Sequence, residues 1–537
     1  MTTAHSNRDA DPFADPSSIH DHEHEHEHQH EHEHSNTLVS DTLLINDRQV
    51  SALVLRAECV TIRHVGLGPR EDDRTWNRPH WCGLGNVWNI TTPSGITTTD
   101  IPYYNILDAY LSSTPPAVTI EYVRSVSKAS VHPAHLAYAI TSDKSADEQA
   151  SAFLNTLLAR SYAHSQQRKR VLVLINPFGG QGRAEQLWTR EAKPIFTAAK
   201  CSLDTQVTAY RGHAVEIAEQ LDIDKYDVVA CCSGDGLPHE VFNGLAKQKF
   251  PRRALSKIAV VQIPCGTGNA MSLNLNGTES PSLAALAIVK GVRRPLDLVS
   301  ITQGENRYLS FLSQAVGIVA ESDLGTENLR WMGSARFTYG FLVRLLGKTV
   351  YPCDVAVKVE IESKEAIKES WREARTQDTS VEDGQNKVRE AEADDEGETQ
   401  LPPLRYGTVK QSLPEGWHMQ AMPELGNFYC GNMLHMSSDS PIFPCALPCD
   451  GRADLVTVAG TIPRLAAIDL LLSVEKGTFM DKPLVDYRKV SAYRIIPRGD
   501  EGYISIDGER VPFAPFQAEV HRGLGCVLSR GGSGYCA

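Results

Sequence analysis

Residues 227–246, DVVACCSGDGLPHEVFNGLA, contain the pattern that decides the fold. An apolar run comes first, a glycine turn follows it, and a stretch with helical spacing comes last. The same order occurs at residues 171–188, VLVLINPFGGQGRAEQLW, and again from residue 258 onward, IAVVQIPCGTGNA. Short apolar runs of this kind are typical of strands that are buried on both faces of a parallel sheet. Three such units predict a doubly wound α/β domain at residues 166–298.

The three glycine loops predict a nucleotide site. Each loop follows a predicted strand and opens a predicted helix, so its backbone N–H groups and the helix dipole would point at a phosphate. The chain has no GxxxxGK[ST] loop, and its first glycine turn lacks the GxGxxG spacing of a dinucleotide site. A single glycine is also the ordinary residue of a tight turn. Three loops in register within about ninety residues are a stronger signal than any one of them.

Asp235 lies between two glycines at the start of a predicted helix. It could cap that helix, because Asp is a favoured N-cap residue and Pro238 suits the first turn. Flanking glycines also let a phosphate and a hydroxyl group approach closely, as a carboxylate acting as general base in phosphoryl transfer requires. The residues alone leave both roles open.

The parts of the chain on either side of this domain are rich in predicted strands. Residues 37–165 contain short alternating apolar stretches and then one helical stretch, which predicts a small antiparallel sheet closed by a helix, similar to a pleckstrin-homology-like module. Residues 299–531 predict an antiparallel β-sandwich. An insertion at about 370–402 includes an acidic tract that cannot bury enough apolar surface to become ordered.

Two segments carry the net charge of −13. Residues 1–34 contribute −8 and residues 381–398 contribute −6, which leaves about +1 for the rest of the chain. A nearly neutral body disfavours a broad nucleic-acid groove. The alternating histidines of residues 20–34 could chelate zinc or nickel, but the predicted state of residues 1–36 is a solvated, disordered tail.

Several absences in the sequence favour an intracellular protein. No apolar run approaches the 18 or so residues of a spanning helix, and the first residues lack the pattern of a signal peptide. The twelve cysteines contain no CxxC pair, so free and mostly buried thiols are expected. We therefore expect a cytoplasmic protein.

Three motifs, NPFGGQGRA, SGDGLPHEVFNGL and IPCGTGNA, resemble the catalytic-domain motifs of the diacylglycerol kinase superfamily. Residues 310–340, SFLSQAVGIVAESDLGTENLRWMGSARFTYG, and the late segment SIDGERV at 505–511 are similar to sphingosine (long-chain base) kinases, and the long N-terminal extension and the acidic insertion look like fungal members. The resemblance implies a Rossmann-like ATP-binding domain followed by a lipid-binding β-sandwich.

The resemblance also implies roles for individual residues. Asp235 matches the general base, Asp323 matches the acid that binds the amino alcohol of the lipid, and Ser313 lies in the same substrate region. Asp507 matches a magnesium ligand. The positions that match ATP-contacting residues are Asn176, Pro177, Phe178, Thr208 through Gly212, Ser233, Gly234, Gly236, Glu240, Gly266, Thr267, Gly268, Arg330, Arg336, Asp507, Gly508 and Glu509.

The resemblance implies a kinase that uses ATP and Mg²⁺ to phosphorylate the primary hydroxyl of sphingoid long-chain bases. A ceramide or diacylglycerol kinase is one alternative, and a non-catalytic lipid- or metal-binding scaffold is another. We expect peripheral attachment to the endoplasmic reticulum, the Golgi or the plasma membrane, through apolar side chains beside the pocket and the basic residues 168–170, unless these form an ordinary linker. A homodimer stays an open alternative.

Overall fold

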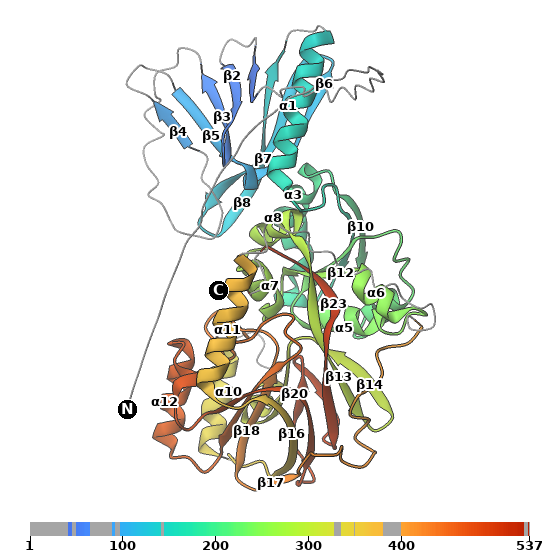
Figure 1. The fold of residues 1–537 in the computed structure, drawn as a ribbon, viewed down its shortest axis with the longest axis vertical. Helices are drawn as coiled ribbons and strands as arrows, with labels where there is room; N and C mark the ends of the chain where they lie inside the picture. Colours follow the sequence, from blue (N-terminus) through green and yellow to red (C-terminus); the bar gives the residue numbers. More distant parts are fainter. Residues whose placement is uncertain are drawn as a thin grey trace, which may run out of the picture. The chain divides into compact units, whose positions relative to one another are not determined.

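The structure is a computed structural model that describes residues 41–45, 50–64, 88–91, 97–140, 144–326, 335–347, 349–379, 399–530 and 535. Four parallel strands confirm the predicted α/β domain, in the order β10-β9-β11-β12. Figure 1 labels two of them, β10 and β12. Their bounds are β9 (Arg170–Ile175), β10 (Ser202–Val207), β11 (Val228–Ser233) and β12 (Ala259–Pro264). Neighbouring residues such as Leu172 and Val173 belong to two different hydrophobic clusters. Both faces are therefore buried, which explains the continuous apolar runs.

Helices cover both faces of this sheet. The two short helices α2 and α3, the helical segment Trp188–Ala192 and helix α8 share one hydrophobic cluster with the sheet, whereas α4, α5, α6 and α7 share the other. The bounds are α2 (Ala184–Leu187), α3 (Lys193–Ala198), α4 (His213–Glu219), α5 (Gly236–Leu245), α6 (Pro251–Lys257), α7 (Ala270–Asn276) and α8 (Pro281–Lys290). Ser280 caps α8 by accepting a hydrogen bond from the backbone N–H of Leu283.

The C-terminal half contains an antiparallel sheet of eleven strands. The strands are β13 (Val292–Gln303), β14 (Asn306–Ser310), β15 (Ser313–Gly317), β16 (Cys353–Ile361), β17 (Gln420–Met422), β18 (Leu425–Gly431), β19 (Ala453–Ala459), β20 (Asp486–Pro497), β21 (Ile504–Ile506), β22 (Glu509–Val511) and β23 (Phe516–Ser529). Strand β13 crosses the predicted domain boundary at residue 298, and Val527 and Leu528 of β23 pack into the two clusters of the α/β domain. The two halves therefore share strands and core at their junction.

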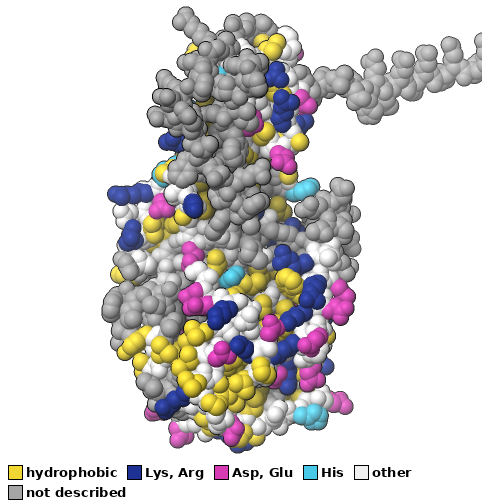
Figure 2. Space-filling view, turned by 90° about the vertical axis from the view of Figure 1, so that its left-hand side faces the viewer, with side chains coloured by type: hydrophobic (Ala, Val, Ile, Leu, Met, Phe, Trp, Pro, Cys, Tyr) yellow, Lys and Arg dark blue, Asp and Glu magenta, His cyan; other side chains and the backbone are white. Residues whose placement is uncertain are grey.

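Four helices accompany this sheet: α9 (Ile318–Leu324), α10 (Ala335–Leu346), α11 (Lys364–Thr379) and α12 (Arg464–Glu475). The predicted insertion at about 370–402 begins inside α11, while residues 380–398 lie outside the described residues. Large hydrophobic side chains are exposed on two of these helices, including Leu342 of α10 at 43% and Leu465 of α12 at 82%. Figure 2 shows one face of the molecule, and hydrophobic side chains gather on the lower part of that face. No helix among the described residues is long and apolar enough to cross a membrane.

The N-terminal region contains eight strands in two antiparallel sheets, and one helix follows them. The first sheet has the order β1-β2-β3-β5-β4 and the second the order β6-β7-β8. The bounds are β1 (Thr42–Leu44), β2 (Val50–Leu55), β3 (Cys59–His64), β4 (Trp88–Thr91), β5 (Thr97–Pro102), β6 (Ile106–Ser113), β7 (Pro116–Ser127), β8 (Ser130–Ala139) and α1 (Lys144–Tyr162). The likeness to a pleckstrin-homology module stays a prediction, and the histidine-rich tail lies outside the described residues.

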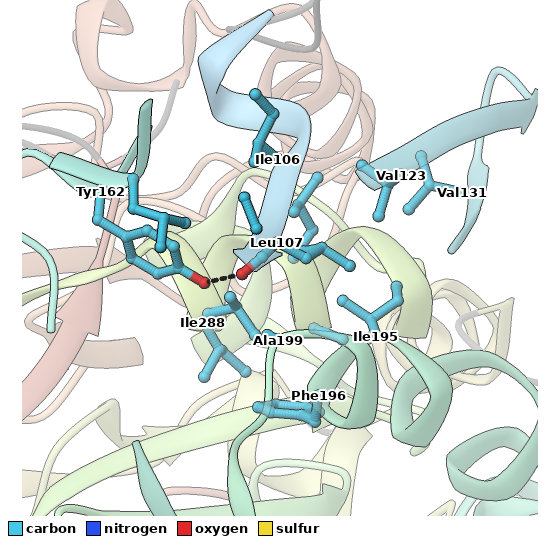
Figure 3. Packing of buried hydrophobic residues seen from close by; sticks show 14 of the residues in the cluster. Ile106, Leu107, Val123, Val131, Tyr162, Ile195, Phe196, Ala199 and Ile288 are labelled. Atoms are coloured by element: carbon cyan, nitrogen blue, oxygen red, sulfur yellow. Dashed lines mark hydrogen bonds between the residues drawn. The ribbon is translucent and has the colours of Figure 1, made fainter. Parts of the chain in front are cut away.

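The N-terminal region shares its core with the α/β domain. Leu107 of β6 belongs to the same buried cluster as Ile195 and Phe196 of α3 and Ile288 of α8 (Figure 3). The hydroxyl of Tyr162 donates a hydrogen bond to the backbone oxygen of Leu107 at 2.6 Å, also drawn in Figure 3. This continuous core joins the two regions without an intervening linker surface.

The predicted basic linker belongs to this junction through its middle residue, whereas the residues on either side are exposed. Lys169 is buried, and its ammonium group donates to the backbone oxygen of Val289 at 2.7 Å. Burial lowers the pKa of Lys169 to about 8. Arg168 and Arg170 pair with Asp108 and Asp227 at 3.4 and 2.7 Å. Both arginines are exposed, so the role of this stretch in membrane attachment stays a prediction.

Leu107→Ala should destabilise the N-terminal region and the α/β domain together. Removing a buried leucine side chain costs about 2–5 kcal/mol, and here the resulting cavity would open inside the shared core. Denaturant unfolding followed by several probes should show one transition that moves as a whole. Val126→Ala is the control, because Val126 on β7 is 59% exposed and should change the free energy of unfolding by less than about 0.5 kcal/mol. A variant that shifts only one of two separate transitions would contradict the shared core.

Candidate active site

The three glycine loops lie against one another with backbone touching backbone. A Cβ atom on Gly180 would lie 1.9 Å from the carbonyl oxygen of Cys265, and one on Gly266 would lie 2.2 Å from the Cα of Gly234. No side chain fits at either approach, so an alanine there would displace backbone. The sequence places these loops far apart, and the parallel order of β9, β11 and β12 brings their carboxyl ends to one edge of the sheet.

Asp235 projects into this junction from the turn between β11 and α5. Its side chain makes no capping hydrogen bond to α5, so the predicted capping of its own helix is wrong. Instead, its carboxylate accepts hydrogen bonds from the backbone N–H groups of Ala270 and Met271, both at 2.9 Å, at the start of α7. Gln262 donates a third hydrogen bond, at 3.2 Å. The carboxylate is therefore held in one orientation by a helix that belongs to the next glycine loop.

The surroundings of Asp235 set its basicity. Burial raises the pKa of Asp235 to about 6, the hydrogen bonds from Met271, Ala270 and Gln262 oppose this rise, and the nearby charge of Asp507 adds to it. A carboxylate with this pKa is ionised at neutral pH and more basic than an exposed one. It can therefore accept a proton from a hydroxyl group as that group reacts.

Asp507 is a buried carboxylate whose oxygens are both occupied by protein donors. Its Oδ1 accepts from the hydroxyl of Ser310 at 2.5 Å and from the backbone N–H groups of Leu312 and Ser313 at 2.9 Å. Its Oδ2 accepts from the backbone N–H of Phe311 at 3.0 Å and lies 2.8 Å from Nδ1 of His239. This set of contacts makes Asp507 a positioning residue, and the metal role expected for it stays a prediction.

His239 connects Asp507 to helix α5. Burial lowers the pKa of His239, but the hydrogen bond and the charge of Asp507 outweigh that effect and raise the pKa above its usual value. The pair fixes the turn between β21 and β22 against the helix that Asp235 precedes. Glu509, two residues after Asp507, consequently lies beside the glycine turn: a Cβ on Gly236 would be 3.0 Å from its Oε1, and its Oε2 pairs with Arg211.

Several predicted ATP-contacting residues build the loops themselves. Glu240 accepts from the backbone N–H groups of Gly212 and Ala214 at 2.8 and 3.1 Å, and so caps α4. Gly212 has φ of +91°, a conformation that favours glycine. Asn176 holds its own turn by accepting from the backbone N–H of Phe178 at 3.0 Å, which leaves the Phe178 side chain 80% exposed beside the loops.

The remaining predicted ATP-contacting residues either make short-range hydrogen bonds within their own loops or lie outside the described residues. The hydroxyl groups of Thr208 and Ser233 donate to the backbone oxygens of Ile175 and Gly234, at 3.3 and 2.6 Å. Arg330 lies outside the described residues. Arg336 lies in α10, and its side chain is outside the description as well.

The predicted substrate residues Asp323 and Ser313 lie near the turn between β21 and β22, which holds Asp507 and Gly508. Asp323 is in the last turn of α9. A Cβ on Gly508 would lie 3.8 Å from Oδ2 of Asp323. Ser313 is buried at the start of β15 and hydrogen-bonds with the hydroxyl of Tyr429. Burial raises the pKa of Tyr429, and the charges of Asp323, Asp507 and Asp235 add to that rise.

Tyr429 also lines an apolar cavity of about 250 Å³ between the sheet and the helices α9, α10 and α12. Ile318, Phe341, Val456 and Leu470 are among its walls. Neither Tyr429 nor this cavity was predicted, because the sequence GNFYCGNML gives no functional signal around the tyrosine. Gln262 was also missed, although a polar residue inside the apolar run IAVVQIP was a readable signal.

Comparisons with known proteins agree with this geometry. Residues 170–301 match the family described as diacylglycerol kinase catalytic domain, and residues 27–163 match a domain of unknown function (DUF7493). A sphingoid long chain base kinase 4 of Schizosaccharomyces pombe is 32% identical over 433 residues, which cover 80% of this chain and 88% of that protein. Sphingoid long chain base kinase 5 of Saccharomyces cerevisiae is 36% identical over 423 residues, and the match covers 70% of this chain but 61% of that longer protein.

Among solved structures, a diacylglycerol kinase from Bacillus anthracis aligns with a TM-score of 0.42 and 17% identity, over 68% of this chain and 98% of that one. The family match, together with the three joined glycine loops, defines the class as lipid kinases with a diacylglycerol kinase catalytic domain. Within that class, the chain belongs to the sphingoid long-chain base kinase family.

Asp235→Asn should lower kcat by about 10²–10⁴-fold, because an amide cannot accept the hydroxyl proton. Its oxygen can still accept one backbone N–H bond of α7, so the melting temperature should fall only slightly. Asp204→Asn is the control, because Asp204 is an acid of β10 paired with Lys225 at 2.8 Å, outside the glycine loops. Steady-state turnover and thermal melting of both variants provide the measurement.

The pH dependence of the unmodified enzyme gives a second readout of the same prediction. A general base must be ionised, so kcat/KM should fall as the pH drops below about 6. This limb should be absent from the residual activity of Asp235→Asn. A variant with near-normal kcat and an unchanged pH profile would restrict Asp235 to capping α7.

Proposed function

We propose that this chain transfers the γ-phosphoryl group of ATP to the primary hydroxyl of a sphingoid long-chain base. The observation that carries the proposal is that Asp235 and Asp323 lie on either side of one short loop, residues 507–509. Gly236, next to the base Asp235, lies against Glu509, and Gly508 lies against Asp323. A hydroxyl near Asp235 and an ammonium group near Asp323 would therefore belong to one small head group, which is the chemistry of a sphingoid base.

The apolar cavity supports the same substrate class. Its walls come from α9, which carries Asp323, and from α12 and β18, and Tyr429 lies both in its lining and next to the carboxylates. A single hydrocarbon tail could lie in the cavity while the head group faces the glycine loops. A neutral ceramide or diacylglycerol head group would bring no cation to Asp323, so this acid would favour a sphingoid base over either of them.

In the proposed reaction, Asp235 accepts the proton of the primary hydroxyl while the oxygen attacks the γ-phosphorus and ADP leaves. The backbone N–H groups of the glycine loops bind the phosphates, and Phe178 and the α4 cap border the nucleotide. Asp507 orients the turn between β21 and β22 through its contact with His239.

A magnesium ion would take most of its ligands at this site from the nucleotide phosphates. Among the described residues no group of three His, Cys, Asp or Glu side chains could hold a metal, and Mg²⁺ commonly binds one or two carboxylates together with substrate phosphates. Glu509 is the carboxylate beside the glycine turn that could supply such a ligand. The ion would neutralise charge that develops on the transferred phosphoryl group.

The exposed apolar side chains of α10 and α12 support peripheral attachment to a membrane. Tyr339, Leu342 and Val343 on α10 and Leu465 and Leu472 on α12 are exposed, and both helices also line the apolar cavity. A lipid could therefore pass from the bilayer into the cavity beside these helices. The compartment would be the cytoplasmic face of an internal membrane or of the plasma membrane.

The decisive assay is ATP turnover by the purified chain with dihydrosphingosine, ceramide, diacylglycerol and no lipid. Turnover that depends on dihydrosphingosine separates a kinase from a non-catalytic scaffold. Faster phosphorylation of ceramide than of dihydrosphingosine would overturn the role given to Asp323.

Asp323→Asn should raise KM for dihydrosphingosine at least about tenfold and change KM for ATP by less than about twofold. Loss of one partner from a desolvated charge pair costs about 2–5 kcal/mol, which sets the scale of the effect. Asp204→Asn again serves as the control, and melting temperatures show whether either variant is unfolded. A selective rise of KM for ATP would refute the assignment.

Leu465→Glu combined with Leu472→Glu should weaken binding to anionic vesicles by tenfold or more, since each leucine contributes about 1.5–3 kcal/mol when it leaves water. Turnover of detergent-dispersed substrate should change little, because neither side chain lines the cavity. The control is Val126→Glu, an equally exposed apolar position on β7 of the N-terminal region. Vesicle sedimentation measures the effect, and equal sedimentation of all three proteins would remove this surface from the proposal.

A further inference from the structure

A group of basic side chains lies on one face of the antiparallel sheet, away from the glycine loops. Arg307 of β14 donates from Nε and Nη2 to the hydroxyl of Ser300 on β13, at 3.1 and 2.9 Å. Its Nη2 also lies 3.3 Å from Nε2 of His521 on β23. Glu519 is two residues before His521 on the same strand and therefore on the same face.

The segment that follows the acidic tract crosses this face. The backbone N–H groups of Arg405 and Tyr406 donate to the two oxygens of Glu519 at 3.0 and 3.1 Å, and the backbone oxygen of Pro402 accepts from Arg307 at 2.7 Å. These bonds fix Arg405 close to Arg307. They also occupy both oxygens of Glu519, which is the acid of this face.

Helix α6 brings a third guanidinium group to the same place. α6 packs beside β23, and Nε of Arg252 is buried without a hydrogen-bond partner. Burial lowers the pKa of Arg307, and the charge of Arg252 adds to this effect while Glu519 opposes it. Three positive groups from three different elements therefore converge where one carboxylate is already hydrogen-bonded.

The pKa of His521 responds to the positive charge of these arginines. Burial together with the charges of Arg307, Arg405 and Arg252 lowers the pKa of His521 to about 4. The neutral ring can then accept the hydrogen bond from Arg307. An anion between the arginines would reduce this repulsion and supply an acceptor for Arg252.

We propose that Arg252, Arg307 and Arg405 form a second anion-binding site that takes an oxyanion of the phosphate class. Planar guanidinium groups match the geometry of phosphate oxygens, and the partly buried positions of Arg252 and Arg307 strengthen their bonds relative to the exposed Arg405. The site lies at the junction of α6 with the antiparallel sheet and shares no residue with the nucleotide loops. Its ligand would be either a soluble phosphate or the phosphate head group of an anionic lipid.

The test uses the full chain with the nucleotide site filled by ADP and Mg²⁺, so that added phosphate cannot act there. Pyrophosphate is titrated while the pKa of His521 is followed by NMR of its ring protons. Binding should raise that pKa from about 4, because the anion offsets the three positive charges. Arg252→Gln and Arg405→Gln should each weaken binding tenfold or more.

Arg253→Gln is the matched control. Arg253 is the neighbouring residue on α6, is exposed, and pairs with Asp224 at 3.3 Å, so its loss should change pyrophosphate affinity by less than about twofold. Melting temperatures check that the variants are folded, and Arg307 is left intact because it bonds to Ser300 and Pro402. The site is overturned if neither pyrophosphate nor phosphatidic acid vesicles change the His521 pKa of the unmodified protein, or if Arg252→Gln and Arg253→Gln lose equal affinity.

Vesicles distinguish the two sources of phosphate. Phosphatidic acid vesicles that raise the His521 pKa, with no response to pyrophosphate, would identify a lipid head group, and a response to pyrophosphate would identify a soluble ligand. Vesicles of phosphatidylcholine alone should produce no change. A response of the same size to phosphatidylcholine would mean that the field at His521 reports membrane contact and would overturn the anion site.

Discussion

The buried carboxylate of Asp507 is the interaction on which the catalytic cleft depends. It accepts hydrogen bonds from Ser310 and three consecutive backbone N–H groups, residues 311–313, and it binds His239 of α5. A carboxylate removed from water is costly unless its lone pairs are filled, and here protein donors fill them. One residue thereby fixes the β14–β15 turn, the β21–β22 turn and the helix of the α/β domain. Glu509, and Gly508 beside Asp323, take their positions from this arrangement.

Asp235 shows how a group that takes part in folding can also be fit for chemistry. Its two hydrogen bonds to the start of α7 hold the carboxylate still, and burial makes it more basic than an exposed acid. These effects act in opposite directions on its pKa, and burial is the larger. A base that was only hydrogen-bonded would be too weak, whereas one that was only buried would be protonated at neutral pH. The glycines beside it allow α7 to approach closely enough for both effects to coexist.

Much of the fold could be predicted because the relevant signals are local. The apolar runs of β9, β11 and β12 and the glycine turns after them predicted the parallel sheet and the edge where the loops meet. Tertiary contacts decided what could not be predicted. Asp235 caps a helix that begins 35 residues later, Lys169 is buried in a core shared by two regions, and Asp507 is saturated by backbone donors from another turn. Residue type indicated that these groups mattered, but not which partner each would take.

In the proposed function, the polar head and the apolar tail of the substrate bind at two different places, because each needs different surroundings. The polar head of a long-chain base must meet carboxylates and phosphate donors, and these lie where strand ends and glycine loops converge. The tail needs an apolar volume, which a loop-lined edge cannot supply because loops expose backbone polar groups. The cavity is therefore built elsewhere, between the sheet and the helices α9, α10 and α12, and Tyr429 connects it to the carboxylates. In the function proposed above, α9 carries the head-group acid Asp323 and also lines the cavity, so a shift of this one helix would alter head-group binding and tail binding together.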